Sequence, residues 1–218
     1  MHKALDDIAL VVFDLDGTLI DSAPDLTTAV AKTLADYGLE PAGLDSVRHW
    51  VGNGSHKLVE RALANAAADG VDTDEAHEAF LRHYAAAPCT DTVLYDGVRE
   101  CLESLRDQAY DLMLVTNKPI AFLPPILDAL DLNGFFSLTL GGDSLTQKKP
   151  DPAPLLYAAR QGDIAPGAGL MIGDSRHDVQ AGKAAGFRTL AVTYGYNHGD
   201  PISDSGPDHI VDSLAELL

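Results

Sequence analysis

The chain has 218 residues, a length that favours one domain with a smaller insertion over two full domains. Hydrophobic residues make up 46% of the chain and charged residues 22%, so we expect a sizeable buried core and exclude a disordered chain. The 33 acidic residues outnumber the 15 basic ones, for a formal net charge of −18. Because this charge repels nucleic acid and anionic membrane surfaces, we expect neither of them as a partner.

Four short apolar runs each predict a strand of a parallel sheet that is buried on both faces. They cover residues 8–13, 112–115, 170–172 and 190–192. The first two stop at a polar residue that is followed by a loop and a helical pattern, which indicates repeated strand–helix units. We therefore expect an α/β protein with a three-layer, Rossmann-like core and a mainly parallel sheet.

The long stretch after the first strand contains helical patterns but no convincing strand. The patterns cover residues 23–37, 55–68 and 74–86. We expect residues 23–88 to form an inserted helical cap, and residues 1–22 and 89–218 to form the catalytic core. Hinges are expected near residues 22–24 and 88–91, where Pro and small polar residues mark the crossings between cap and core.

The two cysteines and the distribution of apolar residues bear on the compartment. Cys89 and Cys101 match no CxxC or zinc-ligand spacing, so we expect two free thiols. The first residues carry acids, and no segment approaches the length of a membrane span. The sequence therefore predicts a soluble, cytoplasmic protein, and it leaves the oligomeric state open.

Polar residues follow the predicted strands at the points where these strands end. Ligands of such sheets bind beyond the carboxyl ends of the strands, so Asp14, Thr116 and Asp174 are expected to meet in space. In Asp14-Leu15-Asp16-Gly17-Thr18, alternation along an extended backbone points both carboxylates to the same side, and Gly17 permits the turn that follows.

Residues 13–22, Phe-Asp-Leu-Asp-Gly-Thr-Leu-Ile-Asp-Ser, resemble the first motif of the haloacid dehalogenase-like hydrolase superfamily. The other motifs follow in order, as Val-Thr-Asn-Lys at residues 115–118, Lys149-Pro150, and Gly-Asp-Ser-Arg-His-Asp at residues 173–178. Residues 50–54, 58–61 and 193–196 are similar to the phosphoglycolate phosphatase family. Four ordered motifs outweigh the alternative that isolated acids after strands are helix caps.

The resemblance implies a phosphatase that hydrolyses a small phosphorylated metabolite, with 2-phosphoglycolate as the leading substrate. It implies Asp14 as the nucleophile and Asp16 as the general acid and base. Dehalogenation is rejected because a halide leaves without a proton, and Asp16 is absent from that branch of the superfamily. The resemblance also assigns Mg²⁺ to the side chains of Asp14 and Asp174 and to the backbone carbonyl of Asp16.

The remaining motif residues are expected to contact the phosphate or to hold those that do. Lys149 neutralises the attacked oxygens, while the Thr116 hydroxyl and the Asn117 amide donate hydrogen bonds to them. Asp178 orients Lys149 or the waters around the metal ion. Lys118 and Arg176 are expected to be solvated side chains, and Lys148 a surface residue.

In the cap, Gly52-Asn53-Gly54 precedes a helix that we expect to begin near Ser55. Amides at that helix N-terminus suit a carboxylate, so Gly52 and Asn53 are candidate substrate contacts. Arg48, His56 and Lys57 are further candidates in this segment. Three alternatives remain open: a phosphatase for another metabolite, such as a sugar or amino-sugar phosphate, a nucleotide or pyrophosphate; a phosphosugar mutase; and a non-catalytic phosphate-binding module.

Overall fold

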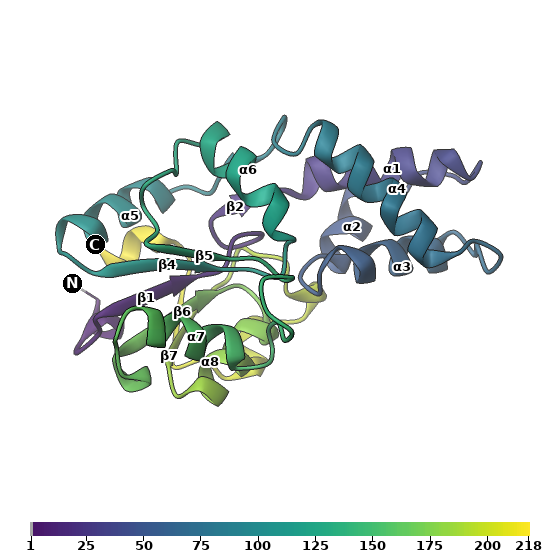
Figure 1. Ribbon diagram of the computed structural model, residues 1–218. Coiled ribbons are helices and arrows are strands. Elements are labelled where there is room, and N and C mark those ends of the chain that lie inside the picture. The colour runs from purple at the N-terminus through teal and green to yellow at the C-terminus, as the bar shows by residue number, and fades with distance from the viewer. Residues whose placement is uncertain (1) are drawn as a thin grey trace.

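The computed structural model describes residues 2–218. Its centre is a six-stranded, fully parallel sheet with the strand order β5-β4-β1-β6-β7-β8 (Figure 1). The strands are β1 (Leu10–Phe13), β4 (Asp111–Val115), β5 (Leu138–Leu140), β6 (Gly169–Gly173), β7 (Arg188–Val192) and β8 (His209–Val211). The expected α/β class and mainly parallel sheet are confirmed.

Helices cover both faces of the sheet and complete the three layers (Figure 1). Figure 1 shows α5 (Val98–Asp107) and α6 (Leu123–Ala129) on one face, with α7 (Ala153–Gln161) and α8 (Arg176–Ala185) on the other. Strand β1 alternates between the two layers. Its Val11 and Phe13 belong to the apolar cluster that includes side chains of α5 and α6, and its Leu10 and Val12 to the cluster that includes those of α7 and α8. Both faces are buried, which explains the unbroken apolar run in the sequence.

The four strands predicted from apolar runs are β1, β4, β6 and β7, with bounds that differ by one or two residues. The sequence did not predict β5 and β8, which form the two edges of the sheet. Each has only three residues, and each is partly exposed. Edge strands pack on fewer neighbours than central strands, so they lack the continuous apolar run that marks the others.

Four helices form the inserted cap, which lies to one side of the core (Figure 1). They are α1 (Ala23–Asp36), α2 (Leu44–Trp50), α3 (Ser55–Asn65) and α4 (Thr73–Ala86). Three of them were expected, whereas the seven-residue α2 is too short for its periodicity to stand out. We propose that residues 23–88 form the cap and that residues 1–22 and 89–218 form the core. Residue 1 lies outside the described residues.

The chain crosses between core and cap twice, and the two crossings are tied together. Strands β2 (Ile20–Asp21) and β3 (Val93–Leu94) pair antiparallel at this point. The buried Asp25 carboxylate accepts hydrogen bonds of 2.8–3.1 Å from the backbone amides of residues 90–92 and one of 2.6 Å from the Thr92 hydroxyl. One side chain at the start of α1 therefore fixes the path of the returning chain.

The described residues also answer two expectations that were drawn from composition. Cys89 and Cys101 are both free thiols, as expected, and Cys101 is buried. None of the helices in residues 2–218 combines the length and the apolar character that crossing a bilayer requires.

Candidate active site

The parallel sheet brings the predicted residues to one edge, because the carboxyl ends of its strands point the same way. Asp14 follows β1, Thr116 follows β4 and Asp174 follows β6. All three side chains are buried. Asp14 and Thr116 line one pocket beneath the cap, and Asp14 and Asp174 belong to one carboxylate cluster.

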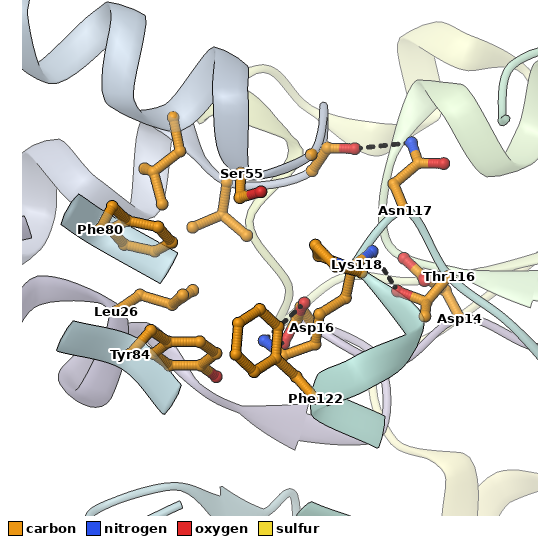
Figure 2. Close-up of a pocket in the computed structure, with 15 residues that line it drawn as sticks. Asp14, Asp16, Leu26, Ser55, Phe80, Tyr84, Thr116, Asn117, Lys118 and Phe122 are labelled. Carbon is orange, nitrogen blue, oxygen red and sulfur yellow. Dashed lines mark hydrogen bonds and ion pairs between the residues drawn. The ribbon is translucent and has the colours of Figure 1, made fainter. Parts of the chain in front are cut away.

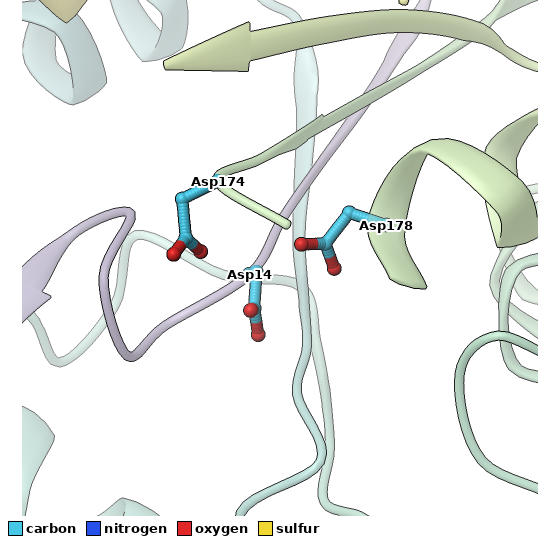
Figure 3. A group of neighbouring side chains, drawn as sticks. All are labelled: Asp14, Asp174 and Asp178. Atoms are coloured by element: carbon cyan, nitrogen blue, oxygen red, sulfur yellow. The ribbon is translucent and has the colours of Figure 1, made fainter. Parts of the chain in front are cut away.

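Three carboxylates converge at this edge, as Figure 3 shows for Asp14, Asp174 and Asp178. Each offers an oxygen that lies within 4.8 Å of the others. Burial raises the pKa of Asp14 to about 6, although the Lys149 charge lowers it, and the Asp178 charge adds a smaller rise. Burial, Asp178 and Asp14 together raise the pKa of Asp174 to about 8. The carboxylates repel one another when they are ionised, and a divalent cation between them would relieve this repulsion. Their oxygens are the hard ligands that Mg²⁺ prefers.

Lys149 is the cation that the described residues place against this cluster. Its Nζ lies 2.9 Å from Asp14 Oδ1 and donates to Asp178 Oδ1 at 2.7 Å. Burial disfavours the charged ammonium, but Asp14 and Asp178 outweigh it, so the pKa of Lys149 is raised. Asp178 is itself fixed, because its Oδ2 accepts from the Ser175 amide at 3.0 Å and hydroxyl at 2.7 Å. Asp178 thus makes the contact with Lys149 that the sequence predicted.

Asp174 is held by segments far from it in the sequence. Its Oδ1 accepts from the Thr18 hydroxyl at 3.0 Å, and its Oδ2 accepts from the Tyr196 amide at 2.7 Å. Gly17 adopts a φ of +86°, and a Cβ there would lie 2.3 Å from Asp174 Oδ2. Only glycine can therefore occupy this position, which explains the turn residue in the first motif.

Asp16 lies outside the carboxylate cluster and has different partners. The Ser22 hydroxyl donates to Asp16 Oδ1 at 2.5 Å, and Lys118 Nζ lies 3.0 and 3.2 Å from the two carboxylate oxygens. The expectation that Lys118 is solvated is wrong, since its side chain is only 3% exposed. The sequence missed this because the contact joins loops 102 residues apart. Arg176 and Lys148 are exposed, as expected.

The two residues after β4, Thr116 and Asn117, form hydrogen bonds that hold the loops around the pocket. Thr116 Oγ1 accepts from the Lys118 amide at 3.2 Å, which shapes the loop. The Asn117 side-chain amide donates to the carbonyl of Gly52 at 2.9 Å and to that of Lys149 at 3.0 Å. Asn117 therefore joins the cap loop to the loop that carries Lys149. The role of its backbone amide as a phosphate donor stays a prediction.

The structure separates the candidates in the cap. Gly52 lines the pocket with Asp14, whereas Arg48 and Asn53 do not. Arg48 Nη2 forms an ion pair with Asp21 Oδ2 at 2.8 Å, and Asn53 Nδ2 donates to His177 Nε2 at 2.7 Å. The helix expected to begin near Ser55 begins there.

The pocket combines a polar floor from the core with an apolar wall that comes mainly from the cap (Figure 2). About 470 Å³ of empty space lies among the lining residues, part of it open solvent. The apolar residues include Leu26, Val51, Leu58, Phe80, Tyr84 and Phe122. The sequence predicted the floor from its motifs but not this wall, because core-facing residues of the cap helices show the same apolar spacing.

Sheet, cap and buried carboxylate–lysine site together define an α/β enzyme with its reacting groups between core and cap. A model of the haloacid dehalogenase-like hydrolase family matches residues 11–192. The chain belongs to this family, as its motifs indicated. It is therefore a hydrolase, and the family includes phosphatases that act on small phosphorylated molecules.

Similar proteins of known name share most of their length with this chain. It is 49% identical over 213 residues to a phosphoglycolate phosphatase of Pseudomonas putida, and the matched region covers 96% of this chain and 78% of that protein. It is 45% identical over 214 residues to one of Colwellia psychrerythraea, with 96% and 95% covered. The crystal structure of a predicted phosphoglycolate phosphatase from Haemophilus somnus 129pt has a TM-score of 0.93 and 38% identity, with 97% and 96% covered.

Proposed function

We propose that this chain hydrolyses 2-phosphoglycolate to glycolate and inorganic phosphate with the help of Mg²⁺. The observation that carries the proposal is that Asp14 and Asp16 line one pocket beneath the cap while Lys149 lies 2.9 Å from Asp14. The names of the relatives from Pseudomonas putida and Colwellia psychrerythraea support the substrate. A cytoplasmic location, expected from the sequence, belongs to the same proposal.

The proposed reaction has two steps that share one intermediate. The Asp14 carboxylate attacks phosphorus, so that an Asp14 O–P bond forms while the ester P–O bond breaks. Asp16 gives its proton to the departing glycolate oxygen. Asp16 then takes a proton from the water that attacks the aspartyl-phosphate, which releases phosphate and restores both carboxyl groups.

Neighbouring groups offset the charge that accumulates during both steps. Lys149, held by Asp178, stabilises the negative oxygens beside Asp14. Asp14, Asp174 and the Asp16 carbonyl would hold Mg²⁺, which would supply further positive charge toward the phosphate. Thr116 and the Asn117 amide are proposed as phosphate donors, and the Gly52 loop as part of the cover that excludes water.

Phosphate release across a panel of compounds tests this function. The panel contains 2-phosphoglycolate, hexose and amino-sugar phosphates, nucleotides and pyrophosphate, each with Mg²⁺ and with an EDTA control. We expect dominant, EDTA-sensitive release from 2-phosphoglycolate. Stronger turnover of another compound would replace the substrate. No release from any compound would favour a mutase or a phosphate-binding module.

A further inference from the structure

The pocket beneath the cap has one cationic side chain among the described residues that line it. That residue is Lys118, whose side chain is 3% exposed. Lys118 pairs with Asp16, and the other cations of the cap region lie outside the lining and have partners of their own. Arg48 pairs with Asp21 at 2.8 Å, and Arg61 donates to the Trp50 carbonyl at 2.6 Å. Any negative charge on the part of the substrate that fills this pocket therefore meets Lys118.

A buried hydroxyl whose proton has no acceptor lies beside that ammonium. Tyr84, on α4 of the cap, is 1% exposed, and the polar group nearest its hydroxyl among residues 2–218 is the Lys118 ammonium, which can only donate a hydrogen bond. Lys118 Nζ lies 4.7 Å from the centre of the Tyr84 ring, and Figure 2 shows both residues next to Asp16. Burial raises the pKa of Tyr84 to about 12, so the phenol stays a neutral donor. Leaving a buried donor without an acceptor is costly, which indicates a ligand that accepts from it.

The chemistry of the leaving group connects these residues to Asp16. In 2-phosphoglycolate, one carbon separates the ester oxygen from the carboxylate. A substrate that places its ester oxygen at Asp16 must place its carboxylate close by. Lys118 Nζ is 3.0 Å from Asp16 Oδ1, and the facing wall of Leu26, Phe80 and Phe122 is apolar. This wall offers no side-chain donors for the hydroxyls of a sugar.

We propose that Lys118 and Tyr84 bind the carboxylate of the leaving group, Lys118 through its ammonium and Tyr84 by donating its hydroxyl. The pair then selects phosphate monoesters that carry a carboxylate one carbon from the ester oxygen. This inference rests on the proposed function and names the residues that set its substrate class. Since Tyr84 comes from the cap and Lys118 from the core, the carboxylate site is complete only when the two parts are together.

The test compares 2-phosphoglycolate with 2-hydroxyethyl phosphate, which replaces the carboxylate by an uncharged alcohol. We expect the unaltered protein to prefer 2-phosphoglycolate by about 100-fold in kcat/KM, since the carboxylate meets a buried ammonium. Lys118→Met should remove most of this preference, and Lys118→Arg should keep part of it. Tyr84→Phe should raise KM for 2-phosphoglycolate about tenfold and change that for 2-hydroxyethyl phosphate little. Lys32→Met, at an exposed lysine of α1 outside the pocket lining, should preserve the preference.

The outcomes separate this inference from the function on which it rests. Failure of the unaltered protein to hydrolyse 2-phosphoglycolate, with turnover of another phosphate ester, would reject the proposed function. Good hydrolysis of 2-phosphoglycolate with equal losses on both substrates in Lys118→Met would reject only the carboxylate site, because Lys118 would then act solely through Asp16. Absence of a preference in the unaltered protein would reject the site even where the variants fail to fold.

Discussion

The two aspartates after β1 are close in sequence but differ in their surroundings. Asp14 lies in a buried cluster with two other carboxylates and with Lys149 at 2.9 Å. Asp16 faces Ser22 and Lys118 instead. A nucleophile must be ionised when it attacks, and burial alone raises the pKa of Asp14. The Lys149 ammonium, and a divalent cation when one is bound, favour the ionised form that the attack requires.

The acid role of Asp16 predicts a dependence on the leaving group. Asp16→Asn keeps the size of the side chain, whereas an alanine would leave the buried Lys118 without its partner. We expect a loss of about 10³-fold in kcat/KM for 2-phosphoglycolate and about tenfold for p-nitrophenyl phosphate, whose phenolate leaves without a proton. Steady-state kinetics with both substrates measure this. Losses of equal size would argue against the acid role.

At this scale the sequence predicted most of the polar site. Most of its residues stand in motifs that can be recognised in a single sequence, namely Asp14, Asp16, Lys149, Asp174 and Asp178. Lys118 also stands in a motif, but its burial against Asp16 could not be predicted, and Tyr84 could not be found at all, since both depend on neighbours distant in sequence. Ser22 was expected only as part of a hinge, but its hydroxyl donates a hydrogen bond to Asp16.

The crossings between core and cap are the elements on which closure depends. The Asp25 carboxylate accepts several hydrogen bonds from residues 90–92 there. Asp25→Ala would remove the acceptor of all these donors, of which the amide and hydroxyl of Thr92 are buried, so we expect a loss of about 3 kcal/mol in the free energy of unfolding. Urea denaturation measures it. Asp91→Ala is the matched control, since Asp91 is exposed and contributes only its backbone amide. Equal stability of the two variants would contradict this account.

The cap loop is held against the core by several polar contacts. The Gly52 carbonyl accepts from Asn117 at 2.9 Å, the Asn53 carbonyl accepts from Lys148 at 2.9 Å, and the Asn53 amide donates to His177 at 2.7 Å. These contacts must break when the cap opens. Hydrogen exchange at residues 22–24 and 88–91 should therefore slow when a phosphate analogue such as vanadate is added. Identical exchange with and without the analogue would argue against hinged closure.

The elements themselves were predictable where an apolar pattern is long enough. Strand β1 and helices α1 and α4 match their expected ranges closely, because β1 is apolar throughout and each helix repeats one buried face over several turns. Helix α2 and the edge strands β5 and β8 are short, and each presents only a few buried positions. Their assignment depends on tertiary contacts that a local pattern does not contain.

For the whole molecule, the buried carboxylates couple stability to pH and to Mg²⁺. The pKa of Asp14 is raised from 3.8 to about 6 and that of Asp174 from 3.8 to about 8, so the folded chain binds more protons than the unfolded chain across this range. In the absence of metal, the stability that these two groups contribute is fully present below pH 3.8. It is lost as the pH rises through about 6 and about 8.

A bound cation favours the charged carboxylates and offsets this loss. We therefore expect millimolar Mg²⁺ to raise the melting temperature more at pH 8 than at pH 5, as measured by differential scanning fluorimetry. Asp174→Asn, which removes one of the proposed ligands, should reduce the effect. A shift that is independent of pH, or unchanged in Asp174→Asn, would place the bound Mg²⁺ elsewhere.

The central claim is that Asp14 carries the phosphoryl group during hydrolysis. Phosphate release from 2-phosphoglycolate by Asp14→Asn, beside the unaltered protein and with folding checked by circular dichroism, tests it most directly. The carboxamide is a far weaker nucleophile than the carboxylate, so we predict a loss of ~10⁴-fold or more in kcat with the fold intact. Release by a folded Asp14→Asn at an undiminished rate would contradict the mechanism.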